Sequence, residues 1–336
     1  MEGAEPMSDS IESRLKEDRK FEPSAEFKKA ALVSSPEAYE ALYKRSLGEP
    51  EAFWKEETKD LAWRTPWKKF HEWELPHAKF FVGATLNVSE SCLDRHLTTN
   101  ARTTAALIFE GEPGDTRTLT YFELHREVVR LTAALADLGV KAGDRVAIYM
   151  GMVPEAAIAM LACARIGATH SVIFGGFSSD ALRDRINDCQ AKVLLTQDGA
   201  WRRGNVVPLK KMADVALEGT PTIEKVVVLK RIGRESAPCE MKEGRDVWYE
   251  DLLGRTPSDE SLALAKKPPA FDAEHPLFIL YTSGSTGKPK GVLHTSAGYL
   301  AGAHVTTRYV FDLRDGDLYW CTADVGWVTG HSYIVY

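Results

Sequence analysis

Residues 281–291 hold the densest set of side chains that could handle a phosphate group. The stretch is Tyr281-Thr-Ser-Gly-Ser-Thr-Gly-Lys-Pro-Lys-Gly291, with three glycines, four hydroxyl side chains and two lysines. Glycines let the backbone approach an anion closely, and successive N–H groups can then form a concave nest for phosphate oxygens. The hydroxyls add donors, and Lys288 and Lys290 add charge. This composition predicts a phosphate-binding loop. A flexible linker is disfavoured because the loop follows an apolar, strand-like run at 276–281.

The spacing of this loop differs from that of the Walker A motif. In that motif four residues separate the two glycines, and a Mg²⁺-binding hydroxyl follows the lysine. Here only two residues separate Gly284 from Gly287, and Pro289 follows Lys288. Because proline lacks an N–H and fixes φ, the loop cannot turn directly into a helix N-terminus. A phosphotransferase of the Walker class is therefore disfavoured.

An alternation of strand and helix patterns must position this loop. A hairpin is expected at 103–121, followed by a helix with the capping box Thr120-Tyr-Phe-Glu123 and a C-terminal Gly139. Strands are then expected at 145–150, 170–174, 192–196 and 225–230, and helices at 154–166, 179–189 and 208–217. This order predicts an α/β fold with a mostly parallel sheet. Residues 231–272 are rich in proline and charge and are expected to form an irregular surface excursion.

Two more loops follow predicted strands, which is where such sheets bind ligands. One is Phe174-Gly-Gly-Phe177. The other, at 196–208, contains Trp201-Arg-Arg-Gly-Asn205. Arginine suits phosphate forks and stacking on purine rings. From the residues alone, a ligand-binding loop and a solvated basic loop explain this second segment equally well.

The first part of the chain has a different character. Residues 1–34 are polar and carry both signs of charge, which predicts a weakly ordered leader. Ser35-Pro36 is a good helix start, and helices are expected at 36–45 and 50–61. Five aromatic residues are expected to form a packed unit that holds the leader to the body: Trp54, Trp63, Trp67, Phe70 and Trp73.

Composition limits the function further. Apolar content of 44% and charged content of 27% are ordinary for a soluble globular protein, and the net charge of −6 does not favour nucleic acid or an anionic membrane. The five cysteines include no C-x-x-C pair, which disfavours a zinc site and favours a reducing, cytoplasmic location. The apolar pattern at 332–336 predicts an exposed strand at the end of the chain. We therefore expect a domain cut at its C-terminus, with poor solubility in isolation.

Three stretches together resemble the acyl-adenylate-forming (AMP-binding) ligases, and within them the acetate–CoA ligase branch. They are the loop at 281–292, Ile173-Phe-Gly-Gly-Phe-Ser178, and Trp320-Cys-Thr-Ala-Asp-Val-Gly-Trp-Val-Thr-Gly-His331. The resemblance covers residues 35–336. It implies an N-terminal extension at 35–95 and, at 96–336, a large N-terminal adenylating-enzyme domain with mostly parallel sheets. That domain would be truncated, and the family's small C-terminal domain would be absent.

The resemblance implies a two-step reaction. ATP, with Mg²⁺, and acetate give acetyl-AMP and pyrophosphate, and the CoA thiol then gives acetyl-CoA and AMP. The family's adenylation lysine lies in the small C-terminal domain, so no catalytic residue and no metal ligand are assigned here. The implied partners are the small molecules acetate, ATP and CoA, with no nucleic acid and no membrane. The oligomeric state stays open.

The resemblance also assigns binding residues. The ATP phosphates would contact Thr282, Ser283, Gly284, Ser285, Thr286, Gly287 and Lys288. CoA would contact Gly175, Gly176, Arg202, Arg203, Gly204, Asn205 and Thr329, with its pantetheine arm running past the two adjacent glycines. The acetate pocket would be formed by Trp327, Val328 and Thr329. At Asn205 the chain departs from bacterial members of the family, which carry a second arginine there.

Two functions of different classes remain open. The first is an acetate–CoA ligase of which this chain is the N-terminal part, the part itself being inactive. The second is a stand-alone, non-catalytic nucleotide- or CoA-binding protein. A propionate-preferring ligase is a variant of the first. Val328 weakly favours a short acyl chain, but the tryptophan that closes the family's pocket would lie beyond Tyr336.

Overall fold

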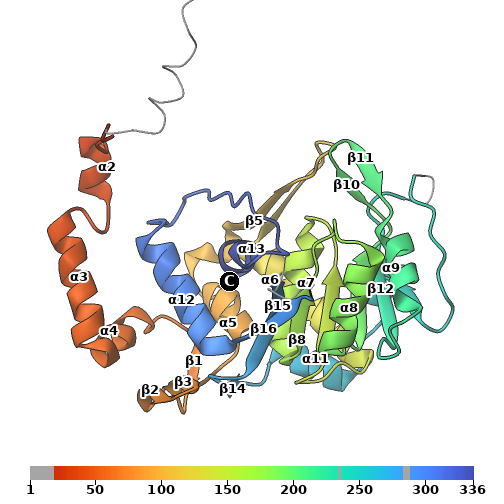
Figure 1. Cartoon of the computed structure of the whole chain (residues 1–336), viewed down its shortest axis with the longest axis horizontal. Helices are drawn as coiled ribbons and strands as arrows, with labels where there is room; N and C mark the ends of the chain where they lie inside the picture. The colour runs from red at the N-terminus through yellow and green to blue at the C-terminus, as the bar shows by residue number, and fades with distance from the viewer. Residues whose placement is uncertain (1–18, 234–235, 283–287) are drawn as a thin grey trace, which may run out of the picture. The chain divides into compact units, whose positions relative to one another are not determined.

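The computed structural model describes residues 19–233, 236–282 and 288–336. The chain divides into two compact units, 1–48 and 49–336 (Figure 1). In the first, α3 (Pro36–Gly48) begins where Ser35-Pro36 predicts, and the Ser35 hydroxyl accepts a hydrogen bond from the Ala38 N–H at 3.2 Å. A short helix, α2 (Ala25–Ala30), was not predicted. It is capped by Ser24, a signal that the surrounding charged residues obscured.

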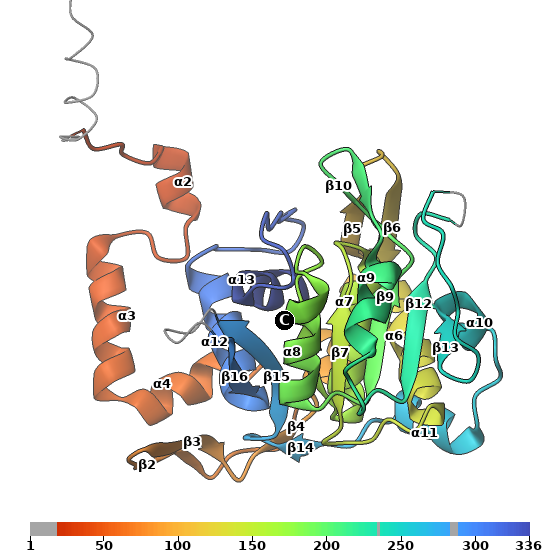
Figure 2. The same ribbon diagram turned by 45° about the vertical axis from the view of Figure 1, so that its right-hand side comes forward.

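A seven-stranded sheet forms the centre of the larger unit (Figure 2). From edge to edge its strands are β13 (Asp246–Trp248), β12 (Lys225–Leu229), β9 (Val193–Gln197), β7 (Arg145–Tyr149), β8 (Thr169–Val172), β15 (Pro276–Thr282) and β16 (Lys290–Thr295). Every neighbouring pair is parallel except β15–β16, which is antiparallel. The predicted α/β fold with a mostly parallel sheet is confirmed.

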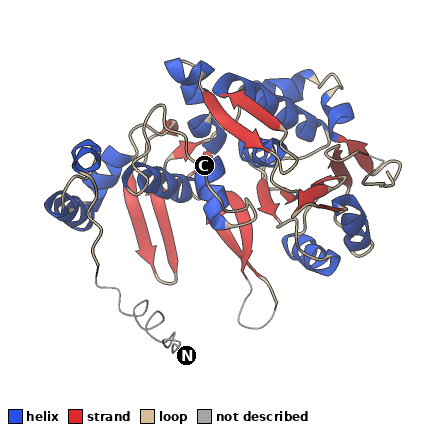
Figure 3. Cartoon of the chain, turned by 90° about the horizontal axis from the view of Figure 1, so that it is seen from above, coloured by secondary structure: helices blue, strands red, loops and turns tan. Residues whose placement is uncertain are grey.

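Helices cover both faces of this sheet (Figure 3). One face packs against α6 (Tyr121–Asp137), α7 (Pro154–Ile166) and α10 (Tyr249–Leu253), and the other against α8 (Ser179–Cys189) and α9 (Leu209–Leu217). Side chains alternate between the faces along each strand. In β9, Val193 and Leu195 join the first cluster and Leu194 the second. Both faces are apolar, as expected for parallel strands that are covered on both sides.

The helix signals in the sequence act as predicted. Thr120 and Glu123 form the capping box of α6, and Gly139, just beyond its end, has φ of 86°. Helix α7 starts at a proline and ends at Gly167, whose φ is 82°. The predicted bounds of α7 and α8, 154–166 and 179–189, are also their bounds in the structure.

Residues 50–103 form a small region of α4 (Pro50–Glu57), β1 (Trp63–Thr65), β2 (Lys69–Glu74), β3 (His77–Val82), β4 (Thr85–Leu86), α5 (Val88–Cys92) and two 3₁₀ turns (Asp94–His96 and Asn100–Thr103). Four of the five predicted aromatic residues surround Phe81, with ring centroids 5.6–6.1 Å from it. The fifth, Trp73, is 61% exposed and lies at the edge of the cluster, with its ring centroid 6.3 Å from that of Phe80. The cluster packs beside β15 and α12 (Ser296–Tyr309).

Two sequence expectations were wrong. The supposedly irregular segment 231–272 contains β13, α10, α11 (Asp259–Lys266) and β14 (Phe271–Asp272). Strand β13 has only three residues, too few to show a period in the sequence. The expected exposed strand at the end is instead helical, as α13 (Val328–Gly330) and a π-helical turn (His331–Val335), and Ile334, Val335 and Tyr336 pack against the core.

Candidate functional site

The loops singled out in the sequence leave the same edge of the sheet. Strands β7, β8, β9, β12 and β15 are parallel, so their carboxyl ends lie together. From β7 the chain crosses to β8 on one side and then returns to β9 on the other. Ligands of open α/β sheets bind where the crossover direction reverses in this way. The glycine loop after β8 and the phosphate loop after β15 leave neighbouring strands.

A cavity of about 240 Å³ lies at this edge. Among the sequence-predicted residues its lining includes Gly175, Gly176 and Arg202. Its wall also contains Phe109 and Arg231. The structure thus brings the predicted pantetheine glycines and one predicted arginine into a single cavity, although Gly176 and Arg202 are 26 positions apart in the sequence.

Arg202 lies flat within this cavity. Its guanidinium carbon is 4.6 Å from the centre of the Phe174 ring. A Cβ at position 176 would overlap Arg202 Nη1, so glycine there makes room for the arginine. Besides this ring, the guanidinium interacts electrostatically with the Asp324 carboxylate. Its planar fork of donors suits an anionic ligand.

The rest of the basic segment is a β-hairpin, which the sequence did not indicate. Strands β10 (Ala200–Arg202) and β11 (Asn205–Val207) are joined by Arg203 and Gly204, with φ of 52° and 76°. Positive φ at both positions is the geometry of a two-residue hairpin turn. Asn205 Nδ2 donates back to the Arg203 carbonyl at 3.1 Å. Arg203, Gly204 and Asn205 are exposed and do not line the cavity described above.

A second hairpin holds the first. Strands β5 (Ala105–Glu110) and β6 (Thr116–Thr120) pair as predicted, and the two hairpins lie side by side (Figures 1 and 2). The Arg203 N–H donates to Glu112 Oε2 at 3.0 Å, and the Gly204 N–H donates to Glu112 Oε1. Glu112 was not identified from the sequence, because its partners are about ninety positions away.

The phosphate loop is the connection of the antiparallel hairpin β15–β16. Thr282 pairs with Lys290 and Tyr281 with Gly291, so a strand follows the loop, which agrees with the rejection of the Walker geometry. Thr282 and Lys288 are exposed, whereas Ser283, Gly284, Ser285, Thr286 and Gly287 lie outside the described residues. The Tyr281 hydroxyl donates to Asp188 Oδ2 of α8 at 2.6 Å. Burial, together with this carboxylate, raises the pKa of Tyr281.

The residues predicted for the acetate pocket lie at the start of α13. Trp327 contacts Phe174, with ring centroids 6.2 Å apart, but it is 53% exposed, and Val328 and Thr329 are exposed as well. These three side chains therefore do not enclose a pocket within the described residues. A larger cavity of about 700 Å³, lined by the segment 317–325, shares Phe109 and Asp324 with the smaller one. Burial raises the pKa of Asp324.

Asp198 is a second functional candidate that sequence reasoning missed. It is 2% exposed and follows β9 directly. Its carboxylate accepts hydrogen bonds from the N–H groups of Gly199, Arg231, Ile232 and Gly233 at 2.7–3.0 Å. It thereby fixes the start of the loop after β12, which carries Arg231 into the cavity wall. An aspartate between a buried strand and a glycine is the only sequence signal for this role.

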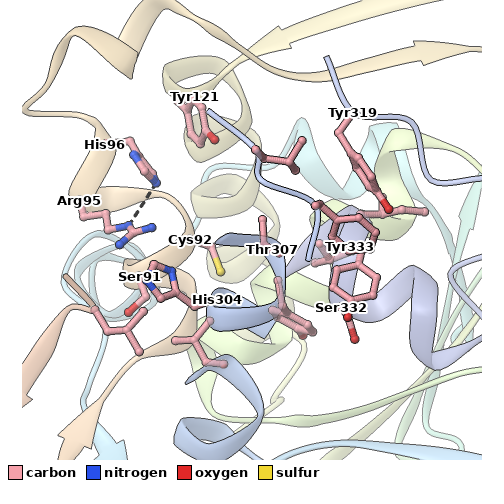
Figure 4. Close-up of a pocket in the computed structure, with 17 residues that line it drawn as sticks. Ser91, Cys92, Arg95, His96, Tyr121, His304, Thr307, Tyr319, Ser332 and Tyr333 are labelled. Atoms are coloured by element: carbon pink, nitrogen blue, oxygen red, sulfur yellow. Dashed lines mark hydrogen bonds between the residues drawn. The ribbon is translucent and has the colours of Figure 1, made fainter. Parts of the chain in front are cut away.

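Another cavity, of about 280 Å³, contains none of the predicted site residues (Figure 4). It is lined by Cys92, Arg95, His96 and His304 among others. Burial raises the pKa of Cys92 to about 12 and lowers that of His96 to about 4. Both groups are therefore uncharged near neutral pH, and Arg95 donates hydrogen bonds to His96 and to the Asp60 carbonyl.

Two absences hold for the described ranges. No helix there is long and apolar enough to cross a bilayer. No group of three or more His, Cys, Asp or Glu side chains there is arranged to hold a metal ion.

Comparison with known proteins agrees with the fold. Residues 93–336 match the family described as AMP-binding enzyme, and residues 39–92 match the acetyl-coenzyme A synthetase N-terminus. The chain belongs to the AMP-binding enzyme family.

Its relatives are similar along nearly the whole chain. An acetyl-coenzyme A synthetase of Gemmatimonas aurantiaca is 54% identical over 334 residues, which is 98% of this chain and 49% of that protein. One from Deinococcus radiodurans is 53% identical over 330 residues, again 98% and 49%. The structure of an acetoacetyl-CoA synthetase from Streptomyces lividans is 27% identical, with a TM-score of 0.81 over 93% of this chain and 48% of that one. The chain thus spans about half the length of the relatives it matches.

Proposed function

We propose that this chain is the N-terminal part of an acetate–CoA ligase that works through acetyl-AMP. The substrates would be acetate, CoA and ATP with Mg²⁺, and the compartment the cytoplasm, in keeping with five cysteines that form no disulfide. The observation that carries this proposal is the shared sheet edge. There the glycine loop after β8 and the phosphate loop after β15 leave adjacent strands, with Arg202 beside the glycines.

Different residues would contact different parts of the three substrates. Thr282 to Lys288 would hold the β- and γ-phosphates, so that pyrophosphate leaves as the acetate oxygen bonds to the α-phosphorus. Gly175 and Gly176 would let the pantetheine arm pass close to the backbone. Arg202 to Asn205 would meet the nucleotide end of CoA. Trp327, Val328 and Thr329 would border the acetate. We also propose the divisions 35–95 and 96–336 as the N-terminal extension and the AMP-binding region.

Calorimetry tests the phosphate loop. The 336-residue chain should bind ATP, and Lys288→Ala should weaken binding about tenfold, the loss expected for about 1.4 kcal/mol of charge-assisted contact. Lys211→Ala, which removes an exposed lysine of α9, is the matched control and should leave the affinity unchanged. Equal effects of the two substitutions would contradict the assignment.

Turnover tests the reaction. A longer gene product that contains this chain should release pyrophosphate in a manner that depends on acetate, CoA and Mg²⁺, more efficiently with acetate than with propionate. The 336-residue chain alone should not. Turnover by the short chain would refute its inactivity. Nucleotide binding without turnover by the longer product would favour the non-catalytic alternative.

A further inference from the structure

We propose that Arg231 is a second phosphate-binding residue, which acts with Arg202 on the nucleotide end of CoA. This inference rests on the proposed function, and neither the sequence motifs nor the resemblance assigns Arg231 a role. Both arginines line the 240 Å³ cavity at the carboxyl edge of the sheet. They reach it from different loops, Arg202 from the hairpin after β9 and Arg231 from the segment after β12.

The surroundings of the two guanidinium groups are alike. Arg202 lies over the Phe174 ring at 4.6 Å and beside Gly176. Arg231 lies over the Phe109 ring at 5.6 Å and beside Gly111, where an added Cβ would lie 2.5 Å from Arg231 Nη2. In each case an aromatic ring supports the flat face of the guanidinium and a glycine leaves room at its edge. Such placement leaves planar donors ready for phosphate oxygens.

Two aspartates position Arg231. Asp198 accepts a hydrogen bond from the Arg231 N–H at 2.9 Å and from the two N–H groups that follow it. The buried carboxylate therefore fixes the backbone at this residue. Asp115, in the β5–β6 turn, accepts from Arg231 Nη2 at 2.8 Å and orients the side chain. Asp115 is 44% exposed, so a more highly charged phosphate can share or replace it at the guanidinium.

The carboxylates near the cavity have partners of their own. Glu112 accepts from the N–H groups of Arg203 and Gly204, and Asp324 accepts from the Gly326 N–H at 2.7 Å. Glu110 is exposed. The partners of Glu112 and Asp324 reduce the repulsion that an incoming phosphate would meet.

Calorimetry with CoA and with dephospho-CoA tests the inference on the full 336-residue chain. Arg231→Ala should weaken CoA binding about tenfold or more and flatten its dependence on salt. Arg231→Lys should recover part of the loss, because it keeps the charge but not the fork. Lys230→Ala is the matched control. Lys230 precedes Arg231 in the sequence but is not among the residues that line the cavity. Its Nζ lies 5.0 Å from the centre of the Trp248 ring.

The outcomes separate this inference from the function on which it rests. If Arg231→Ala leaves the affinity for CoA or its salt dependence unchanged, the role of Arg231 is overturned, and the proposed CoA site is not. Equal losses in Arg231→Ala and Lys230→Ala overturn this role as well. No binding of CoA by the unaltered chain overturns both the role and the proposed CoA site. A loss confined to CoA assigns Arg231 to the 3′-phosphate, and a loss shared with dephospho-CoA assigns it to the pyrophosphate.

Discussion

Among the described residues, Asp94 is the one carboxylate that pairs with the buried Arg165. The Arg165 side chain is fully buried in α7, and its Nη1 and Nη2 donate to Asp94 at 2.7 and 2.9 Å. His125 Nε2 lies 3.2 Å from Asp94 Oδ1. Arg165 Nε donates to the Ala265 carbonyl at the end of α11. This network ties the region around residue 94 to three helices, α6, α7 and α11.

We predict that Asp94→Asn destabilises the chain strongly. The substitution keeps the shape but leaves a buried guanidinium without a counter-charge, which costs about 3–5 kcal/mol. Urea unfolding at pH 7 measures the change. Asp180→Asn is the control. It breaks the ion pair between Asp180 and Arg183. Because the Asp180 side chain is 83% exposed, the loss of stability should be no more than about 1 kcal/mol. Similar losses in both variants would refute the prediction.

Comparing the unaltered chain with Asp94→Asn at different pH values gives a second test. Burial raises the pKa of Asp94, but hydrogen bonds from His125 and Arg165 outweigh it and hold the pKa well below its ordinary value. A carboxyl whose pKa is lowered by folding stabilises the protein above the unfolded-state pKa, about 4, and that contribution is lost as the pH falls further. The gap in stability between the unaltered chain and Asp94→Asn should therefore narrow from pH 7 to pH 3.

Part of the site could be anticipated from single residues. Gly175, Gly176 and Arg202 follow predicted strands. The small size of glycine and the charge of arginine are evident from the sequence itself. Glu112, Asp198 and Arg231 could not be found in this way, because they act through contacts between distant segments. Asp198 meets Gly233 and Glu112 meets Arg203 only after the sheet has assembled.

Among the elements, the β10–β11 hairpin depends on the backbone conformation of its turn. Gly204 has φ of 76°, and a Cβ added there would meet no atom within 4 Å. Gly298, within α12, has the same open surroundings but a helical backbone. Because an added methyl group meets no atom at either position, any difference between the two alanine variants reports the backbone conformation and not steric crowding.

We predict effects of opposite sign for alanine at these two glycines. Gly204→Ala should lower the free energy of unfolding by about 1 kcal/mol, because an L-residue disfavours positive φ. Gly298→Ala should raise it by about 0.5–1 kcal/mol, because alanine loses less entropy in a helix. Urea unfolding measures both. Two changes of the same sign would show that the turn conformation does not control the stability of the hairpin.

The elements that were predicted correctly carry explicit start and stop residues. Helix α7 lies between Pro154 and Gly167, and α6 has its capping box. Two of those that were missed lack such signals. Strand β13 is only three residues long, and the apolar run at 331–335 suits a strand or a buried helix equally. Packing against the core decides such cases, and it cannot be read from one sequence.

On the scale of the whole molecule, the core belongs to the larger unit. Among the described residues, the buried apolar side chains begin at Phe53, and neither α2 nor α3 has a buried residue. The two units therefore differ in how much each can contribute to stability through burial.

We predict that a chain starting at Glu49 folds with nearly the stability of the full chain. Its free energy of unfolding in urea should lie within about 1 kcal/mol of the original, because exposed terminal segments contribute little packing. A matched chain that starts at Lys59 loses Phe53 and Trp54 from the aromatic cluster and should be clearly less stable. A large loss on removal of residues 1–48 would contradict the prediction.

The antiparallel strand next to the phosphate loop has a consequence for handling the protein. Strand β16 ends the sheet, and within the described ranges it pairs on one side only. Val292 and Leu293 on this strand are 43% and 52% exposed. An apolar edge with unpaired backbone groups is a template for another strand, as in domain swapping and fibril growth. The hairpin that frames the phosphate loop is thus also the place where two copies of this chain would begin to aggregate.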